Sequence, residues 1–257
     1  MTARDLVGRK ALVTGGGRGI GRAVALELAR AGCDVAVTWA QRRDDAEATV
    51  RELRALGATA LACRLRLERA EDLAPAVDAA LAGLGHVDLL VSNAGRDFRG
   101  AAVVDTSAEE LLELMTVNAL APHALCRRLV PQMRGRGRAD VVFLSSIVTQ
   151  TNGPAFAPYA MSKAAVEALA FVLAKEEREH GLRVNVVAPG LTDTDMGGRF
   201  LASDVPGEVR ERLLAGLAYG HVCTPEQVAS VVHFLVGPGA SYVNGQRITV
   251  DGGGPKL

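Results

Sequence analysis

The chain has 257 residues, of which 49% are hydrophobic and 23% are charged, and its formal net charge at pH 7 is +0. This composition is typical of a globular protein with a substantial core, and the balanced charge argues against nucleic-acid or anionic-membrane partners. Four cysteines without a CxxC pair and five histidines without an HExxH spacing indicate no metal site, and they favour a reducing, cytoplasmic location.

The N-terminal segment MTARDLVGRKALVTG has no long apolar stretch, so we expect no signal peptide. No apolar run elsewhere reaches the length of a membrane span. We therefore expect no membrane partner.

Short apolar runs alternate with longer amphipathic segments along the chain. We expect strands at 10–14, 34–39, 59–65, 87–92, 140–146, 183–188 and 247–251, and helices at 20–31, 44–56, 73–84, 108–133 and 159–180. This alternation is typical of βαβ units in a parallel sheet that is buried on both faces. The sequence therefore predicts one α/β domain over residues 1–257, with a doubly wound (Rossmann) seven-stranded parallel sheet and helices on both faces.

Residues 190–220 interrupt this alternation between the sixth strand and the next helix. The segment is polar and contains several glycines. Long irregular segments in compact domains are often active-site lids, so we expect a mobile lid over the substrate here.

The first expected strand is followed by TGGGRGIGRA, residues 14–23. Its glycines do not fit the spacing GxGxxG. In a doubly wound sheet, however, this turn points the amides of a helix N-terminus at the ligand, and glycine lets the backbone approach a pyrophosphate. A glycine cluster is also consistent with a simple tight turn, but its place after the first strand favours phosphate binding.

The end of the second strand predicts which dinucleotide is bound. An acidic residue there would bind the ribose hydroxyls of NAD, but the position holds Trp39 and its neighbours, and Asp45 comes too late. Arg42, Arg43 and Arg18 instead offer guanidinium groups, which suit a 2′-phosphate. The sequence therefore predicts NADP(H), with NAD(H) as the alternative. For each arginine taken singly, a solvated helix start is an equally good explanation.

A second group of polar residues follows the fifth strand. Tyr159 and Lys163 are four residues apart on an expected helix, hence on one face. A nearby ammonium group stabilises a phenolate, which would lower the tyrosine pKa and make it usable as a general acid and base. Ser146 lies at the end of the fifth strand, at the edge where such sheets bind ligands, and it could hydrogen-bond a substrate oxygen.

These motifs resemble those of the short-chain dehydrogenase/reductase family. TGGGRGIG (14–21), SNAG (92–95), Asn118, Ser146, Tyr159-x-x-x-Lys163 and PG (189–190) have the order and spacing of that family. The resemblance extends from KALVTG to NGQRITVDGG. The chain looks most similar to 3-oxoacyl-thioester reductases and ketoreductases of secondary metabolism.

The resemblance implies a role for each matching residue. Tyr159 would exchange a proton with the substrate oxygen, Ser146 would orient that oxygen, and Lys163 would bind the nicotinamide ribose and lower the tyrosine pKa. Asn118 would hold a water in a proton relay to Lys163. The cofactor contacts expected from the turn and from the resemblance are Gly15, Gly17, Arg18, Gly19, Ile20, Gly21, Trp39, Arg42, Arg43, Leu67, Asn93, Ala94, Gly95, Tyr159, Lys163, Pro189, Gly190, Thr192 and Thr194.

The chain departs from the family pattern at two positions. Arg66 and Leu67 stand where the family usually has Asp-Val, whose aspartate meets the adenine amino group. Arginine cannot accept that hydrogen bond, although it could stack on the adenine or contribute to phosphate affinity. Thr192 replaces a branched aliphatic residue, which should cost little.

Together these observations predict NADPH-dependent reduction of a ketone to a secondary alcohol. An NAD-dependent alcohol, steroid or sugar dehydrogenase is the alternative, and a non-catalytic cofactor sensor or scaffold of the same fold is a third. Phe98, Phe156 and Phe200 could form apolar walls for the small-molecule carbonyl or alcohol substrate. The resemblance also implies a homotetramer or homodimer.

Overall fold

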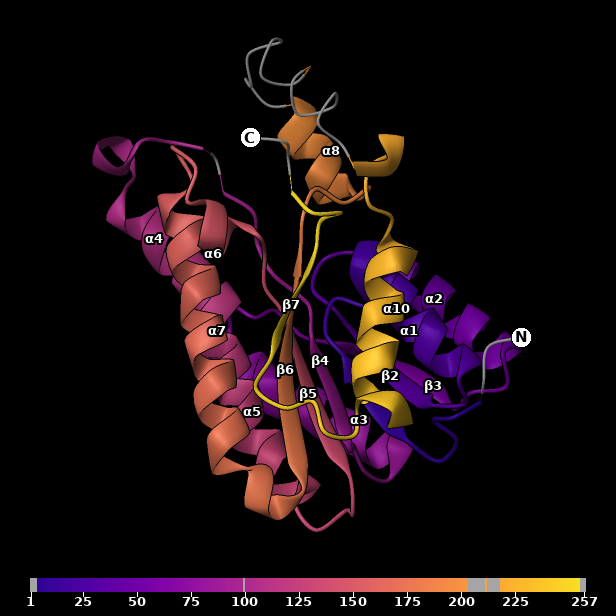
Figure 1. Cartoon of the computed structure of the whole chain (residues 1–257). Coiled ribbons are helices and arrows are strands. Elements are labelled where there is room, and N and C mark those ends of the chain that lie inside the picture. Colours follow the sequence, from indigo (N-terminus) through magenta and orange to yellow (C-terminus); the bar gives the residue numbers. More distant parts are fainter. Residues whose placement is uncertain (1–3, 99, 203–210, 212–217, 255–257) are drawn as a thin grey trace.

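A parallel sheet forms the centre of the structure (Figure 1), a computed structural model that describes residues 4–98, 100–202, 211 and 218–254. In the described part of the chain, seven strands lie in the order β3-β2-β1-β4-β5-β6-β7, and each neighbouring pair is parallel. The strands are β1 (Lys10–Val13), β2 (Asp34–Trp39), β3 (Ala60–Arg64), β4 (Leu89–Ser92), β5 (Ala139–Leu144), β6 (Leu182–Pro189) and β7 (Arg247–Val250). The order changes direction between β1 and β4, which is where such sheets bind ligands.

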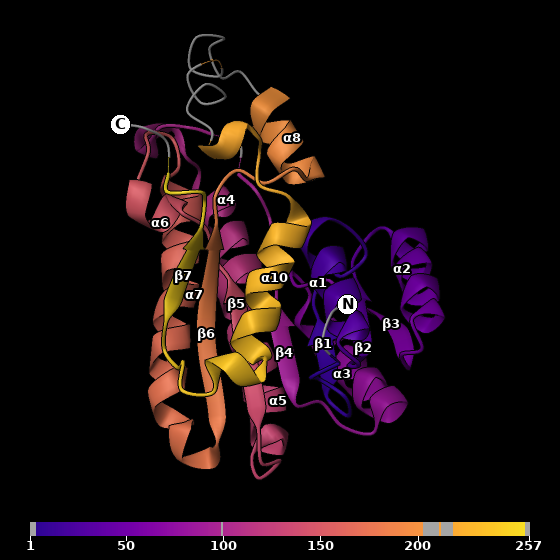
Figure 2. The ribbon, with the colours of Figure 1, turned by 45° about the vertical axis from the view of Figure 1, so that its right-hand side comes forward.

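Helices cover both faces of the sheet, as Figures 1 and 2 show. One apolar layer joins the strands to α1 (Gly19–Arg30), α2 (Arg43–Ala55) and α10 (Pro225–Val236). The other joins them to α3 (Ala70–Leu84), α5 (Ala121–Met133) and α7 (Ala157–Glu176), with α4 (Ala108–Met115) leading into α5. Burial on both faces explains why a strand such as β5 is buried along its whole length. The predicted fold class is confirmed.

The predicted helix at 108–133 is wrong in one respect. Thr116–Leu120 forms a π-helical turn, η2, between α4 and α5. A π turn widens a helix locally and is frequent at functional sites. Here it contains Asn118, one of the predicted site residues.

Several short elements escaped sequence analysis. They are α6 (Val148–Thr151), α8 (Asp195–Ala202) and the 3-10 turns η1 (Val103–Asp105), η3 (Arg178–His180), η4 (Ala218–Gly220) and η5 (Pro238–Ala240). The predicted lid begins with α8, which lies beyond the carboxyl end of β6 (Figure 1). Of its remaining residues, 203–210 and 212–217 lie outside the described residues, and Ala218–Gly220 form η4.

Helix α7 is long and apolar enough, by length and composition alone, to cross a membrane. That differs from the expectation that no run in the chain reaches this length. The helix packs against β5, β6, α4 and α5, and Val166, Ala170 and Leu173 lie in the apolar layer beneath the sheet. We therefore interpret α7 as a core helix.

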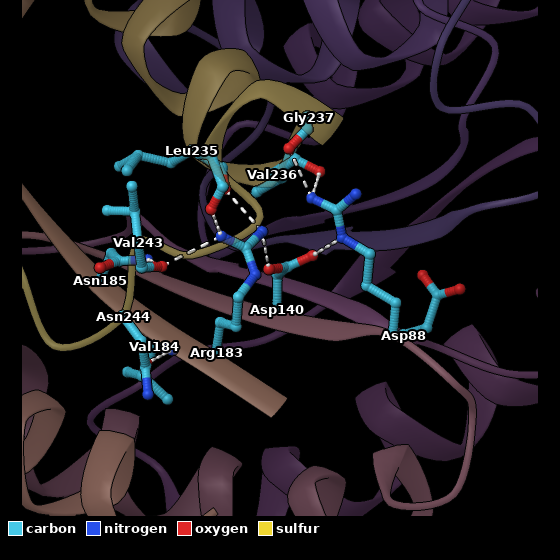
Figure 3. A network of polar contacts seen from close by, with 12 residues as sticks. Asp88, Asp140, Arg183, Val184, Asn185, Leu235, Val236, Gly237, Val243 and Asn244 are labelled. Atoms are coloured by element: carbon cyan, nitrogen blue, oxygen red, sulfur yellow. Dashed lines mark hydrogen bonds and ion pairs between the residues drawn. The ribbon is translucent and has the colours of Figure 1, made fainter. Parts of the chain in front are cut away.

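A buried ionic network joins the amino ends of β1, β4, β5 and β6 (Figure 3). The Asp140 carboxylate lies 2.9 Å from Arg9 Nη2 and 2.5 Å from Arg183 Nη2, while Arg9 Nε lies 3.1 Å from Asp88 Oδ1. Arg183 also donates to the carbonyl oxygen of Leu235, in the last turn of α10, at 2.7 Å. This network lies at the end of the sheet opposite the cavity described next.

Candidate active site

A cavity of about 570 Å³ opens at the carboxyl ends of β1, β2, β4 and β5. Its position is the switch point of the sheet, as expected for a ligand site in this fold. It brings together residues that are up to 180 positions apart in the chain. The predicted site residues that line it are Gly15, Gly17, Arg18, Gly19, Ile20, Gly21, Trp39, Arg42, Leu67, Asn93, Ala94, Gly95, Tyr159, Lys163, Pro189 and Thr194.

The glycine turn forms the floor of one half of this cavity. An added Cβ at Gly21 would lie 2.3 Å from the carbonyl oxygen of Gly15, so only glycine allows this close approach of the backbone. The Gly15 amide donates to Thr38 Oγ1 at 3.1 Å, which ties the turn to the end of β2. Helix α1 begins at Gly19 with neither a side-chain cap nor an acidic residue in its first turn. Its first amides are therefore free to bind an anion, which fits a dinucleotide pyrophosphate.

The SNAG segment after β4 is fastened to the end of β1. Thr14 Oγ1 accepts hydrogen bonds from the amides of Asn93 and Ala94, both at 2.9 Å. Asn93 Nδ2 donates to the carbonyl oxygen of Thr14 at 2.8 Å. The two strand ends therefore form one rigid edge along the cavity.

Of the three arginines predicted to bind a 2′-phosphate, two line the cavity and one does not. Arg18 and Arg42 line the cavity, and both pair with the carboxylate of Asp195 at the start of α8, Arg42 at 3.5 Å. Arg43 instead pairs with Glu47 at 2.6 Å and does not line the cavity, because it lies on the outer side of the first turn of α2. A carboxylate between two guanidinium groups stands in the position that a phosphate would favour.

The cavity also contains an acid that sequence reasoning set aside. Asp45, in the first turn of α2, lines the cavity and lies 3.6 Å from Arg42 Nη1. Beside it, the Arg64 guanidinium lies 5.6 Å from the centroid of the Trp39 ring. The sequence distance from β2 suggested that Asp45 comes too late, but the helix start folds back over the turn.

Arg66 takes no part in the cavity. Its guanidinium forms two hydrogen bonds with the Asp72 carboxylate, at 2.6 and 2.7 Å, and its amide donates to the same carboxylate at 3.2 Å. The Arg66 hydrogen bond lowers the pKa of Asp72 to about 2. Arg66 is therefore held by Asp72 outside the cavity lining, which disfavours the adenine stacking and the phosphate contact considered for it, and its neighbour Leu67 lines the cavity.

Tyr159 and Lys163 share one face of α7, as the spacing predicted. The Tyr159 hydroxyl is hydrogen-bonded to Ser146, and Lys163 Nζ lies 5.7 Å from the tyrosine ring centroid. Lys163 is buried and donates to the carbonyl oxygen of Leu144 at 2.9 Å. Tyr159 and Lys163 line the cavity, whereas Ser146 and Asn118, the other two predicted catalytic residues, are not among its lining residues.

Burial dominates the ionisation of this group. It raises the pKa of Tyr159 to about 12, the Ser146 hydrogen bond opposes the rise, and the charge of Asp97 adds to it. Burial lowers the pKa of Lys163 to about 8, against the charge of Glu167. The expected lowering of the tyrosine pKa by Lys163 is therefore not found, because desolvation disfavours the charged form of both groups.

The two serines after β5 have different environments. The strand ends at Leu144, so both lie beyond it rather than within it. Ser145 Oγ donates to Glu167 at 2.6 Å, whereas Ser146 Oγ faces Tyr159 and accepts from the Val148 amide at 3.3 Å.

Asn118 is buried in the π turn, and its polar atoms are bound within the protein. Oδ1 accepts from the Arg96 amide at 2.8 Å, and Nδ2 donates to the Arg96 carbonyl at 3.1 Å and to Ser162 Oγ at 3.0 Å. An added Cβ at Gly95 would lie 3.0 Å from Asn118 Oδ1 and 3.4 Å from Lys163 Nζ. Asn118 therefore lies near Lys163, but its hydrogen bonds fix the segment after β4.

Two other predicted cofactor contacts lie outside the cavity lining. Gly190 lies against the end of β7, where an added Cβ would be 2.8 Å from Asp251 Cβ. Thr192 is buried and donates to the carbonyl oxygen of Gly190 at 3.0 Å. Both shape the entry to α8, whose first turn is capped when Thr194 Oγ1 accepts from the Gly197 amide at 3.1 Å.

Two aromatic side chains, Phe98 and Phe156, gather beside the Tyr159 ring, although neither lines the cavity. The Phe98 ring stacks on the Tyr159 ring with 5.3 Å between centroids, and Phe156 lies 4.5 Å from Phe98. The side chain of Phe200 lies outside the described residues. An apolar aromatic wall therefore lies beside the candidate reacting hydroxyl.

Comparison with known proteins identifies the family. A family model described as "Enoyl-(Acyl carrier protein) reductase" matches residues 15–254. The chain belongs to the short-chain dehydrogenase/reductase family. A curated relative, the hydroxynaphthalene reductase-like protein Arp2 of Metarhizium robertsii, is 34% identical over 262 residues, which cover 98% of this chain and 97% of the relative.

Two solved structures of short-chain dehydrogenase/reductases are similar to the whole fold. The angucycline C-6 ketoreductase LanV with bound NADP is 33% identical, covers 96% of each chain and has a TM-score of 0.87. A 7α-hydroxysteroid dehydrogenase complexed with NADH and 7-oxo glycochenodeoxycholic acid is 31% identical, covers 100% of this chain and 98% of that chain, and has a TM-score of 0.91. This short-chain dehydrogenase/reductase is thus an oxidoreductase for a CH–OH or C=O group, with a nicotinamide dinucleotide cofactor.

Sequence reasoning missed several residues of this site. Thr14 and Thr38 shape the glycine turn, and Glu167 and Arg247 support the reacting group from behind. The spacing of Glu167, four residues after Lys163, could have placed it on the same helical face. No local sequence pattern indicates Arg247. It lies near the site because β7 pairs with β6 in the sheet.

Proposed function

We propose that this protein reduces a ketone to a secondary alcohol with NADPH, using Tyr159 as the proton donor. One observation carries the proposal: Tyr159 and Lys163 line a cavity that continues to the glycine turn, and Ser146, which does not line it, acts on the Tyr159 hydroxyl as a hydrogen-bond partner. A substrate oxygen placed between these two hydroxyls would lie beside the dinucleotide-binding half of the cavity.

The cofactor supplies a hydride from its nicotinamide ring when it is bound. The chain would hold its pyrophosphate with the amides of the α1 turn, and its two ends with the SNAG segment, Lys163 and Thr194. Asn93, Ala94 and Gly95 of the SNAG segment, Lys163 and Thr194 all line the cavity. Their donors suit phosphate and hydroxyl groups, which supports a dinucleotide in this position.

The ionisation of Tyr159 supports the reductive direction. Because its pKa is raised to about 12, the hydroxyl keeps its proton at neutral pH and can donate it to a carbonyl oxygen that gains charge. Ser146 would hydrogen-bond the same oxygen and orient it. Lys163, with a pKa of about 8, is mostly charged at neutral pH and would stabilise the tyrosinate left behind.

The Tyr159→Phe variant tests the role of this hydroxyl. We expect turnover of a reducible ketone to fall at least about a hundredfold, the upper part of the usual contribution of a positioned acid, while NADPH binding persists. NADPH oxidation measured with an acetoacetyl thioester, a quinone, a bicyclic ketone and a steroid ketone would find the substrate. Tyr242→Phe, on a fully exposed tyrosine, is the matched control. Unchanged turnover in Tyr159→Phe would contradict the mechanism.

Two arginines in the cavity support NADPH over NADH. Arg18 and Arg42 can meet a 2′-phosphate, whereas Asp45 favours the runner-up, an NAD-dependent dehydrogenase. The chain has a single tryptophan, Trp39, and it lines the cavity. We expect titration of Trp39 fluorescence to give a lower Kd for NADPH than for NADH, and Arg42→Gln to weaken NADPH binding selectively. A lower Kd for NADH than for NADPH would contradict the proposed preference for NADPH.

The substrate and the assembly are proposed more coarsely. The wall formed by Phe98 and Phe156 supports a ketone with a flat, apolar body.

We also propose a homotetramer or homodimer in the cytoplasm. Exposed apolar side chains on one side of the molecule, Leu112, Leu120 and Val172, support self-association.

A further inference from the structure

Glu167 lies on α7 one helical turn beyond Lys163. Its Oε1 atom accepts three hydrogen bonds, from Ser145 Oγ at 2.6 Å, Thr149 Oγ1 at 3.0 Å and Arg247 Nε at 2.9 Å. The Glu167 and Arg247 side chains are only 12% and 11% exposed. Tyr159, Lys163 and Glu167 follow each other at intervals of four residues, so the carboxylate continues the face that carries the reacting groups.

Arg247 is the first residue of β7 and reaches the same turn from the other side. Its Nη2 donates to the backbone carbonyl of Ser146 and to Thr149 Oγ1, both at 3.1 Å, and its Nη1 donates to Thr249 Oγ1 at 2.7 Å. The Arg247 guanidinium therefore holds the backbone of Ser146 in place. Arginine suits this task because its donors are fixed in a plane.

We propose that Glu167 and Arg247 are positioning residues for the reaction: together they fix the Ser145–Thr149 turn that presents Ser146 to Tyr159, and the Glu167 carboxylate keeps Lys163 charged. The inference rests on the proposed function, since it concerns the groups that would move the proton. Neither residue lines the cavity, so each acts through Ser146 and Lys163.

The surroundings of Lys163 explain the second part of this role. Burial disfavours its ammonium form, and Glu167 opposes that effect. Beyond Glu167, Tyr159 lies beside Lys163 on its own helix, Asp97 after β4 acts on Tyr159 through its charge, and Arg247 on β7 is hydrogen-bonded to Glu167. The Leu144 carbonyl from β5 also favours the ammonium form through its hydrogen bond. Glu167 is thus the carboxylate on the side of Lys163 away from the cavity.

A merely structural ion pair between α7 and β7 predicts something different. Loss of either partner would lower stability, but it would leave kcat and its pH profile unchanged in the folded variant. A positioning role predicts opposite shifts, because Glu167→Gln removes a negative charge near Lys163 whereas Arg247→Gln leaves that charge uncompensated. Arg247→Lys keeps the positive charge but loses the planar fork.

The chain has only four lysines, so the titration of Lys163 can be followed directly by NMR of lysine labelled at Cε. Lys163→Arg assigns its resonance. We expect Glu167→Gln to lower the Lys163 pKa by roughly half a unit to one unit, Arg247→Gln to raise it by a similar amount, and Arg247→Lys to leave it nearly unchanged. The matched control is Glu177→Gln, which removes a similarly buried carboxylate, paired with Arg134 at the far end of α7; it should have no effect.

Kinetics with NADPH and a bicyclic aryl ketone, 1-tetralone, test the first part. We expect Arg247→Lys to lower kcat on the order of tenfold with little change in KM, because Ser146 loses its alignment. In Glu167→Gln the loss of activity at alkaline pH should begin at lower pH. Equal Lys163 titration in all variants, or shifts of the same sign in Glu167→Gln and Arg247→Gln, would overturn the inference.

The two readouts separate this inference from the proposed function. The lysine titration needs no substrate, so opposite shifts without any ketone reduction would leave the charge coupling in place and refute the function. Should Glu167→Gln fail to fold, the Arg247→Gln and Arg247→Lys variants by themselves show the direction of the Lys163 pKa shift. Normal reduction with no shift in either arginine variant would refute only the inference.

Discussion

At the scale of single residues, Lys163 shows how function and stability oppose each other. Its ammonium group is buried, and burial lowers its pKa from 10.5 to about 8. Folding therefore has to desolvate a charge at neutral pH, and the Leu144 carbonyl and the Glu167 charge offset part of the cost. The spacing of Tyr159 and Lys163 predicted their shared face. The direction of their pKa shifts was not predictable, because burial depends on elements distant in sequence.

Replacing Lys163 with methionine should stabilise the protein at neutral pH. The depressed pKa means that the unfolded chain binds a proton between about pH 8 and 10.5 that the native state lacks, so this lysine's penalty is fully present below pH 8 and fades as pH rises. Allowing for the lost Leu144 hydrogen bond, we expect a gain of about 2 kcal/mol at pH 7 that disappears above pH 10.5.

Thermal unfolding of Lys163→Met at pH 7 and above pH 10.5 measures this effect. Lys175→Met, on an exposed lysine of the same helix, should show no such pH dependence. A variant less stable than the parent at pH 7 would mean that the ammonium is better solvated or paired than its burial indicates.

At the scale of elements, the first turn of α8 is held to the glycine turn. Asp195 pairs with both Arg18 and Arg42, although 177 positions separate it from Arg18. No sequence pattern predicted this contact, since it depends on β6 lying where it aims α8 across the switch point. The carboxylate competes with a cofactor phosphate for the same two guanidinium groups.

Asp195→Asn should therefore strengthen NADPH binding. The pairs are about half exposed, so the competition is modest, and we expect a decrease in Kd of about two- to fivefold with a smaller change for NADH. Trp39 fluorescence reports both titrations, and Asp193→Asn, two residues earlier in the same segment, is the control. A weaker NADPH complex would show that Asp195 organises the arginines rather than competing for them.

At the scale of the whole molecule, the two ends of the sheet have different tasks. The carboxyl ends carry the cavity, and the amino ends carry the network of Arg9, Asp88, Asp140 and Arg183, of which Figure 3 labels the last three. Asp140 is 2% exposed and also faces Arg138 at 3.4 Å. Three partly buried arginines, Arg9, Arg138 and Arg183, therefore share the buried carboxylate of Asp140 at the end of the sheet away from the cavity.

Asp140→Asn should lower stability without changing catalysis. It leaves these arginines short of a counter-charge in a buried place, which typically costs about 3–5 kcal/mol. We expect a clearly lower midpoint in urea unfolding and an unchanged kcat/KM at temperatures where the variant is folded. Asp78→Asn breaks the exposed pair with Arg128 and should change stability by less than about 1 kcal/mol. A loss of kcat/KM in folded Asp140→Asn would instead couple the two ends.

The fold class, the glycine turn and the Tyr159–Lys163 pair follow from the sequence by itself, because periodicity and local spacing act over a few residues. The sequence does not predict the π turn at Asn118. Nor does it predict that Arg43 and Arg66 lie outside the cavity lining while Asp45 lies in it. The contacts of Asp195 and of Arg247 with residues more than 90 positions away do not follow from the sequence either. These were decided by tertiary structure alone, because side-chain partners and burial are set by the order in which the strands lie side by side.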